Sequence, residues 1–183
     1  MGPAHAGARA VAGDARLFFA AWPDEPLQHS LHDLACRQQP LCGGRPVPLE
    51  RIHLTLAFLG KLPLARVDEL FDIAGAVAPP DIVLTLDRIG YWRGPQVVWA
   101  GAAKCPDGLT GWVAGLTAAL RRSGFRTETR AFVPHVTLLR KARRAPPSPL
   151  PAEMVWPLKA YSLVESVSSA EGLRYRILQR WPG

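Results

Sequence analysis

The sequence predicts a bilobal α+β protein whose two lobes follow one plan. Short apolar runs typical of strands alternate with segments of helical periodicity along the 183 residues. Two His-x-Thr tripeptides, which begin at His53 and His135, each lie in an apolar strand pattern and are 82 residues apart. An apolar run precedes each motif at a similar distance. His53 follows Phe18 by 35 residues and His135 follows Val98 by 37 residues, with a helix-like segment in each interval. Such self-similarity indicates an internal duplication.

The elements of the first lobe follow from apolar spacing and from residues that break regular structure. An apolar run ended by Pro23 predicts a strand over Arg16–Trp22, because proline cannot donate to a ladder. Leucines at helical spacing predict a helix over Pro26–Arg37, with Asp24 near its start as a cap. The segment Pro40–Pro48, which contains two glycines, predicts a loop that leads into the first motif strand.

Later elements are bounded by glycine and proline in the same way. The first motif strand is expected to end at Gly60, and a helix over Asp107–Ser123 is assigned to the second lobe because its position parallels that of the first helix. The other predicted elements are a helix over Leu64–Val77 stopped by Pro79 and Pro80, a hairpin of Ile82–Ile89 with Gln96–Ala100, the second motif strand over His135–Arg140, a loop over Lys141–Pro151, and a C-terminal hairpin of Trp156–Ser168 with Leu173–Trp181.

Composition restricts the class of protein. Hydrophobic residues make up 48% of the chain, which excludes an intrinsically disordered protein. The Ala/Gly-rich residues 1–14 predict a flexible tail, followed by a single bilobal domain over residues 15–183. Twenty-two Lys and Arg against 15 Asp and Glu give a net charge of +7, which favours a polyanionic partner such as RNA or a phosphorylated small molecule; solubility alone is the alternative explanation.

The expected compartment is the cytoplasm. The three cysteines are odd in number and match no zinc or redox spacing, so we expect reduced, inert thiols. No stretch approaches the roughly 18 apolar residues that a membrane span requires, so no membrane partner is expected. We expect a monomer.

The two motifs predict a pair of catalytic histidines. Because strand side chains alternate between faces, each motif places an imidazole and a hydroxyl on one face, while the apolar residues Leu54, Leu56 and Phe58, or Val136 and Leu138, anchor the other face to the core. Two lobes that face each other would bring the two imidazoles to opposite sides of one cleft. An imidazole pKa of about 6.5 allows one ring to be a base and the other an acid near neutral pH.

This arrangement suits in-line displacement at phosphorus, where the attacking and leaving oxygens lie on opposite sides. His53 and His135 are the candidate catalytic residues. Thr55 and Thr137 supply hydroxyl donors for the phosphate oxygens, and Arg130, in the loop before the second motif, adds a cation.

No metal and no cofactor is expected, because neither motif has a second histidine or an acid on the same face. A metal-dependent phosphoesterase and a noncatalytic RNA-binding module stay open as alternatives. Four aromatic residues are candidates for base stacking, with core packing as the simpler explanation: Phe18, Phe19, Trp92 and Trp99.

These residues resemble the 2H phosphoesterase superfamily, and specifically its RNA 2',3'-cyclic phosphodiesterase branch, also called the 2'-5' RNA ligase family. The resemblance covers nearly the whole chain from Arg16. The segments that carry it are Arg16–Ala20 with Trp22 and Pro23, His53–Gly60, Arg130–Leu138, Leu163–Ser166 and Tyr175–Pro182.

The resemblance implies two lobes, each an antiparallel sheet backed by helices, with the active-site cleft between the sheets. It implies metal-independent hydrolysis of an RNA-terminal or nucleotide 2',3'-cyclic phosphate to a 2'-phosphomonoester, with reverse 2'-5' RNA ligation as a further reaction. By carry-over, His53 and His135 are the acid/base pair, Thr55 and Thr137 bind the phosphate, and Arg130 is the phosphate-contact candidate. We expect His53 as the acid toward O3' and His135 as the base toward water, but in a quasi-symmetric cleft the opposite assignment stays open. The alternative is a 2H phosphoesterase that acts on small cyclic nucleotides or 2'-5' oligonucleotides.

Overall fold

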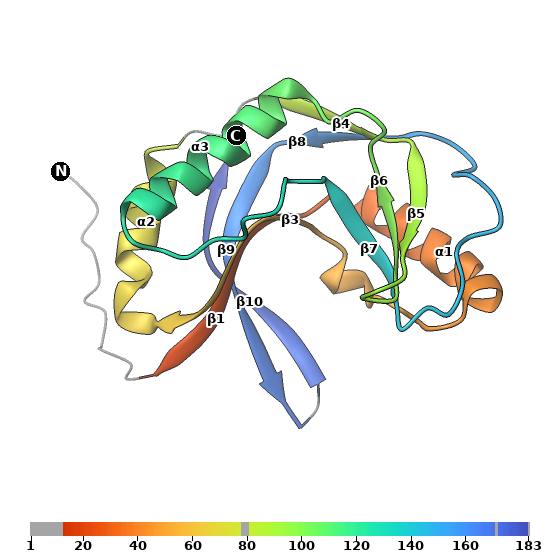
Figure 1. The fold of residues 1–183 in the computed structure, drawn as a ribbon, viewed down its shortest axis with the longest axis horizontal. Helices are drawn as coiled ribbons and strands as arrows, with labels where there is room; N and C mark the ends of the chain where they lie inside the picture. Colours follow the sequence, from red (N-terminus) through yellow and green to blue (C-terminus); the bar gives the residue numbers. More distant parts are fainter. Residues whose placement is uncertain (1–12, 78–80, 171, 183) are drawn as a thin grey trace.

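A bent antiparallel sheet carries both motif strands (Figure 1). The computed structural model describes residues 13–77, 81–170 and 172–182. The fold is α+β, as predicted. Its elements, in chain order, are β1 (Asp14–Ala21), α1 (Glu25–Cys42), β2 (Arg45–Pro46), the 3₁₀ helix η1 (Leu49–Arg51), β3 (Leu54–Pro63), the 3₁₀ helix η2 (Leu64–Arg66), α2 (Val67–Gly75), β4 (Ile82–Leu86), β5 (Arg88–Trp92), β6 (Val97–Gly101), α3 (Asp107–Arg122), β7 (His135–Arg140), β8 (Met154–Leu158), β9 (Ala160–Ser169) and β10 (Gly172–Pro182).

The sheet consists of two halves that meet at the motif strands. Its strand order is β10-β9-β1-β3-β7-β6-β5, with β2 also paired to β7, and β4 and β8 form a separate two-stranded sheet. The halves join where β3 and β7 pair in antiparallel fashion at Leu54 and Val136. Both of these side chains are fully buried. The two lobes expected from the sequence therefore share one sheet, and the motifs lie at their junction.

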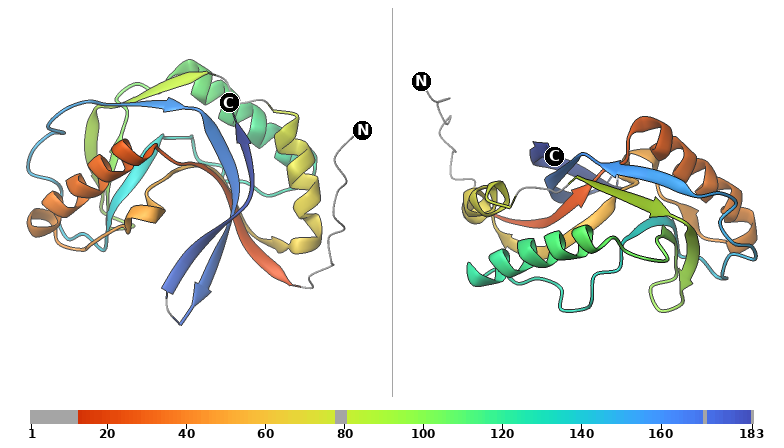
Figure 2. Two further views of the ribbon diagram at one scale, coloured as in Figure 1. Left: turned by 180° about the vertical axis from the view of Figure 1, so that it is seen from behind. Right: turned by 90° about the horizontal axis from the view of Figure 1, so that it is seen from above.

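Helices α1 and α3 each pack against the half of the sheet opposite to the one that sequence order assigned to them, so this assignment was wrong. Helix α1, which follows β1, packs against β2 and β7, whereas α3, which follows β6, packs against β3 and α2. Figures 1 and 2 show α1 beside β5–β7 and both α2 and α3 beside β1 and β3. Because the two halves form one sheet, the apolar face behind them is continuous, and a helix can cover either half. Sequence order alone does not decide between these positions.

Helix α1 begins as predicted but ends later. The Asp24 side chain accepts a hydrogen bond of 3.1 Å from the N–H of Leu27, which confirms the cap. The helix continues through Pro40 to Cys42, in a segment predicted to be a loop. Proline removes one intrahelical hydrogen bond, but Gln38 and Cys42 continue the buried stripe of the helix, and their burial offsets that loss.

Two predicted strands are each divided between two sheets. The predicted strand Ile82–Ile89 breaks at Asp87, so that β4 pairs with β8 while β5 pairs with β6. The predicted strand Trp156–Ser168 breaks at Lys159 into β8 and β9. Among the described strands, β8 is paired only with β4 in the two-stranded sheet, so its other side is an open edge. Pro157 fits in this strand because proline is tolerated at an edge, where no ladder hydrogen bond is needed. The predicted hairpins β5–β6 and β9–β10 are present.

Strand β3 passes through Gly60 and continues to Pro63, so the predicted end of this strand was wrong. Gly60 has a φ of 76°, which glycine adopts without steric cost, and it follows a register irregularity in the pairing with β1. The next helix is present as η2 followed by α2. The predicted stop at Pro79 and Pro80 lies outside the described residues, as do residues 1–12 of the predicted tail, while Asp14 already belongs to β1.

Candidate active site

The two motif histidines have the same local geometry. His53 lies directly before β3 and His135 is the first residue of β7. The Nδ1 atom of His53 lies 2.7 Å from the carbonyl oxygen of Arg51, and that of His135 lies 2.9 Å from the carbonyl oxygen of Val133. Because a carbonyl only accepts, Nδ1 donates in both rings. In the neutral rings Nε2 is therefore the unprotonated nitrogen, the one that can take a proton from water.

The pairing of β3 with β7 places both motifs on one face. Leu54 and Val136 are opposite each other and point into the core, so the residues on either side of each point to the other face, toward the cleft. These residues are the predicted site residues His53, Thr55, His135 and Thr137. The structure thus places both motifs on one face of the sheet at the junction of its halves. His53 and Thr55 also line the cavity at this junction, whereas His135 and Thr137 do not.

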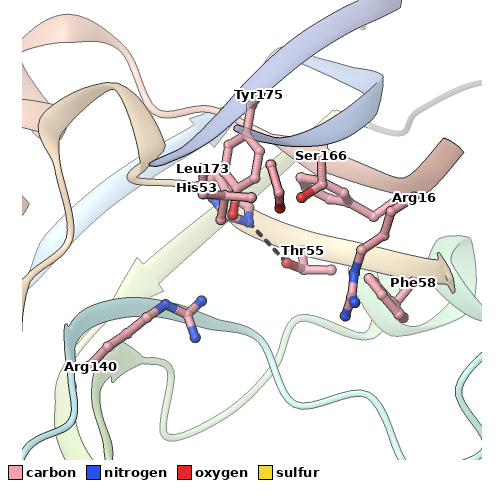
Figure 3. Close-up of a pocket in the computed structure, with 10 residues that line it drawn as sticks. Arg16, His53, Thr55, Phe58, Arg140, Ser166, Leu173 and Tyr175 are labelled. Atoms are coloured by element: carbon pink, nitrogen blue, oxygen red, sulfur yellow. Dashed lines mark hydrogen bonds between the residues drawn. The ribbon is translucent and has the colours of Figure 1, made fainter. Parts of the chain in front are cut away.

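A cavity of about 430 Å³ opens at this junction (Figure 3). In Figure 3, Arg140 reaches in from β7, opposite His53 and Thr55 on the other half. The Thr55 hydroxyl lies 3.1 Å from Nε2 of His53. The residues that line the cavity are Arg16, Phe18, His53, Thr55, Phe58, Arg140, Ser166, Ser168, Leu173 and Tyr175.

A β-bulge follows the threonine of each motif. Leu56 has no partner residue in the pairing of β3 with β1, and Leu138 has none in the pairing of β7 with β6. An extra residue reverses the alternation of side chains beyond it. The bulges therefore turn Phe58 and Arg140, each five residues after its motif histidine, toward the cleft. The prediction that Phe58 anchors the core face was wrong: it is 36% exposed and lines the cavity.

Arg140 and Arg16 are site residues that the sequence reasoning missed. Strict alternation puts Arg140 on the buried face with Leu138, and only the bulge reverses this. The guanidinium group of Arg16, on β1, lies 4.9 Å from the ring centroid of Phe58, within the range of a cation–π contact. In the sequence, the one indication that Arg140 belongs to the site is that Phe58 and Arg140 lie at the same distance after their motif histidines.

Burial lowers the pKa of both histidines. The pKa of His53 falls from 6.5 to about 4, first because burial disfavours the imidazolium and further because of the charges of Arg140 and His135, while the hydrogen bond to Arg51 acts in the opposite direction. The pKa of His135 is lowered by burial and by Arg140, against the effect of its hydrogen bond to Val133. At pH 7 both rings are therefore mainly neutral.

Aromatic rings surround His53. Trp22 stacks on the imidazole with centroids 5.4 Å apart, Tyr175 meets it edge to face at 5.2 Å, and Phe18 lies at 5.4 Å. Trp92 makes an edge contact of 4.5 Å with the ring of His135. Of the predicted stacking candidates, Phe18 and Trp92 thus lie at the site.

The other two stacking candidates have different surroundings. Phe19 is fully buried in the core. Trp99 packs against Trp92 with ring centroids 5.2 Å apart, and a Cβ on Gly90 would clash with the Trp99 ring. A glycine at this position therefore gives Trp99 the room to lie flat on the sheet.

The two other predicted site residues are Thr137 and Arg130. Thr137 lies opposite Trp99 in the pairing of β7 with β6 and is half-buried. The side chain of Arg130 is 85% exposed, and its Nη2 lies 3.2 Å from Oε2 of Glu128. Arg130 would have to leave this carboxylate to contact a phosphate, whereas Arg140 already faces the cavity. Its role as a phosphate contact stays a prediction.

The described part of the chain contains no group of three or more His, Cys, Asp or Glu side chains that could hold a metal ion. Among the described helices, none combines the length and the apolar character that a bilayer span requires.

Comparison with known proteins agrees with this architecture. Residues 22–99 and 101–163 match the family model described as LigT like Phosphoesterase. The chain is 37% identical over 168 residues to an Escherichia coli protein named RNA 2',3'-cyclic phosphodiesterase, covering 91% of this chain and 95% of that one. A Thermus thermophilus protein of the same name is 28% identical over 176 residues, covering 91% and 89% of the two chains.

The fold is also that of a solved relative. The crystal structure of E. coli LigT complexed with 3'-AMP superimposes with a TM-score of 0.83 and 34% identity, covering 93% of this chain and 98% of that chain. Sequence and fold agree over the same length, and the chain belongs to the LigT-like phosphoesterase family.

Proposed function

We propose that the protein hydrolyses RNA-terminal 2',3'-cyclic phosphate to a 2'-phosphomonoester, by acid–base catalysis with His53 and His135 and without a metal ion. The observation that carries the proposal is the matched geometry of the two imidazoles, each held through Nδ1 by a carbonyl two residues upstream. The E. coli and T. thermophilus relatives named RNA 2',3'-cyclic phosphodiesterase support the choice of substrate.

In the proposed reaction His135 takes a proton from water, and the water oxygen attacks phosphorus. The bond from phosphorus to O3' breaks, and His53 gives O3' its proton, so the product carries a 2'-phosphate and a 3'-hydroxyl. Thr55 and Thr137 donate hydrogen bonds to the nonbridging oxygens. Arg140, which faces the cavity, compensates the negative charge that develops on these oxygens.

The surroundings of His53 suit the role of an acid once the phosphate is bound. The negative phosphate raises the pKa of an adjacent imidazole. The stacked ring of Trp22 then stabilises the imidazolium through a cation–π contact. The same ring is neutral in the free enzyme, because burial lowers its pKa to about 4.

The direct test is product analysis. An oligoribonucleotide that ends in a 2',3'-cyclic phosphate should give a product with the mass of one added water that resists a 3'-specific phosphatase. Turnover should be compared with that of free cyclic nucleotides and of 2'-5' dinucleotides, the substrates of the alternative function. Absence of turnover on all of these, with RNA binding retained, would favour a noncatalytic RNA-binding module.

The pH dependence should be bell-shaped, since one histidine must be neutral and the other protonated. Because burial lowers both pKa values in the free enzyme, the bell of kcat/KM should be centred below pH 6.5. The bell of kcat should lie at higher pH, because the bound phosphate raises the histidine pKa values. Initial rates from pH 4 to 9 measure both profiles. A flat profile with chemistry rate-limiting would refute the acid–base scheme.

A chelator should leave activity unchanged. The scheme has no step that needs a Lewis acid, because the two imidazoles transfer the protons and Arg140 and the threonines bind the phosphate. Rates measured after dialysis against EDTA should agree with those of the untreated enzyme within twofold. Loss of activity with EDTA and its return with zinc or manganese would show a metal-dependent phosphoesterase.

The proposed setting is a monomer in the cytoplasm. Cys36, Cys42 and Cys105 are all free thiols in the structure. Burial raises the pKa of Cys42, which keeps this thiol protonated and unreactive.

A further inference from the structure

A second cavity, of about 510 Å³, lies beside the end of β7 and the tip of the β5–β6 hairpin. Among the described residues, three arginines and no carboxylate line it. The complete lining consists of Tyr91, Arg93, Gln96, Arg143, Arg144 and Ala145. None of the salt bridges found among the described residues involves the three guanidinium groups. Their charges are therefore available to an anion.

This basic cavity is held rigidly by hydrogen bonds to the backbone. The hydroxyl of Tyr91 donates to the carbonyl of Ala142 at 3.1 Å, and the N–H of Ala142 donates to the carbonyl of Gln96 at 2.9 Å. The N–H groups of Arg143 and Arg144 both donate to the carbonyl of Cys42, at 2.8 and 3.2 Å. The arginines thus extend from a fixed backbone, which reduces the entropic cost of binding a ligand.

The basic cavity lies close to the candidate active site along two segments of the chain. On one side, Arg140 lines the catalytic cavity and Arg143 lines the basic cavity. Three Cα steps of 3.8 Å place these two Cα atoms within about 11 Å. On the other side, Trp92 contacts the ring of His135, and the next residue, Arg93, lines the basic cavity. A few nucleotides of single-stranded RNA cover such a span.

We propose that this basic cavity binds the phosphodiester backbone of the RNA chain on the 5' side of the terminal nucleotide. Three arginines that line one cavity fit the phosphates of single-stranded RNA, which such sites bind through charge-assisted hydrogen bonds. The proposal rests on the proposed function, since it assumes that the terminal phosphate occupies the catalytic cavity. With RNA bound in this cavity, the protein should prefer RNA ends to free nucleotides as substrates.

The test compares two substrates in two double variants. The substrates are a nucleoside 2',3'-cyclic phosphate and an eight-residue RNA that ends in the same nucleotide with a 2',3'-cyclic phosphate. The variants are Arg143→Ala/Arg144→Ala and, as a control, Arg122→Ala/Arg126→Ala. Arg122 and Arg126 are exposed residues at and after the end of α3, and neither lines either cavity. Both variants remove the same charge, and thermal unfolding checks that both are folded.

In the Arg143/Arg144 variant, KM for the RNA should rise about tenfold, since two charge-assisted hydrogen bonds to phosphates are removed. KM for the mononucleotide and kcat for both substrates should stay within twofold. The slope of log KM for the RNA against log salt should become smaller in magnitude by about 1.4, at about 0.7 for each phosphate that is no longer neutralised. The control variant should leave all of these quantities unchanged.

An equal effect on both substrates would overturn the proposal, because the arginines would then act on the catalytic cavity. No effect on either substrate, or an equal effect in the control, would also overturn it. If the wild type hydrolyses neither substrate, the proposed function fails, and binding of an RNA with a 3'-phosphate, measured by fluorescence anisotropy, still tests the cavity. Displacement of this RNA by polyglutamate as readily as by unlabelled RNA would show a nonselective anion surface and overturn the proposal.

Discussion

Replacing either motif histidine should reduce kcat/KM on an RNA 2',3'-cyclic phosphate by about 10²–10⁴-fold, the contribution of one general acid or base. We expect this result for His53→Ala and for His135→Ala. Because the two rings act on the same displacement, the double variant should be little slower than either single variant. Affinity for an RNA with a 3'-phosphate should stay within threefold, since the threonines and arginines that we propose as phosphate contacts are retained.

The packing of His53 requires a second variant. Its ring touches Trp22, Tyr175 and Phe18, so alanine leaves a gap that can shift these rings. His53→Gln fills most of the space and cannot titrate, and it should be as inactive as alanine. His29→Ala, on the exposed surface of α1, is the control and should have wild-type activity. Activity within tenfold of wild type in His53→Gln would contradict a role in proton transfer.

An aryl phosphodiester can distinguish the acid from the base. Its leaving phenolate needs no proton, so an enzyme without its general acid should keep most of its rate on this substrate. We expect His53→Gln to lose far less activity on the aryl ester than on the cyclic phosphate, and His135→Ala to lose activity on both. The opposite pattern would exchange the roles of the two histidines.

The positions of the histidines and threonines could be predicted from the sequence because they depend on local periodicity. Alternation within a strand places His53 beside Thr55, and a second copy of the motif predicts a facing partner. The exchange of α1 and α3 could not be predicted, because both helices have an apolar stripe that fits either half of a continuous sheet. The extension of α1 through Pro40 was likewise decided by burial of Gln38 and Cys42 against the rest of the fold.

The bulges limited the prediction of the site itself. Strict alternation assigns both Phe58 and Arg140 to the buried face, and both in fact line the cavity. A bulge depends on how two strands pair across the sheet, with Leu56 and Leu138 as the extra residues. The sequence of a single strand does not show which residues of the neighbouring strand it pairs with, so the bulge cannot be predicted from it. The local cue was that two strands with a common plan carry a large residue at the same distance from their histidines.

Replacing Arg140 should cost more than replacing Arg130. We expect Arg140→Ala to lower kcat/KM by about 10²–10³-fold, which is typical for removal of one donor that stabilises charge in the transition state. Arg140 faces the cavity and acts on both histidines through its charge. Arg130→Ala should change kcat/KM less than about threefold, because this guanidinium is exposed and paired with Glu128. The two variants remove the same charge, so each controls for the other.

The pH profile separates two ways in which Arg140 can act. Its positive charge lowers the pKa of His53 and of His135, so its removal should raise both pKa values and move the bell of kcat/KM to higher pH. A variant that only contained less folded protein would have a lower rate with the same bell. Arg140→Lys keeps the charge but not the planar, bidentate group, so it should keep the wild-type bell and recover only part of the rate. If Arg130→Ala proves the more damaging change, the phosphate is held by the loop before His135, as the sequence alone suggested.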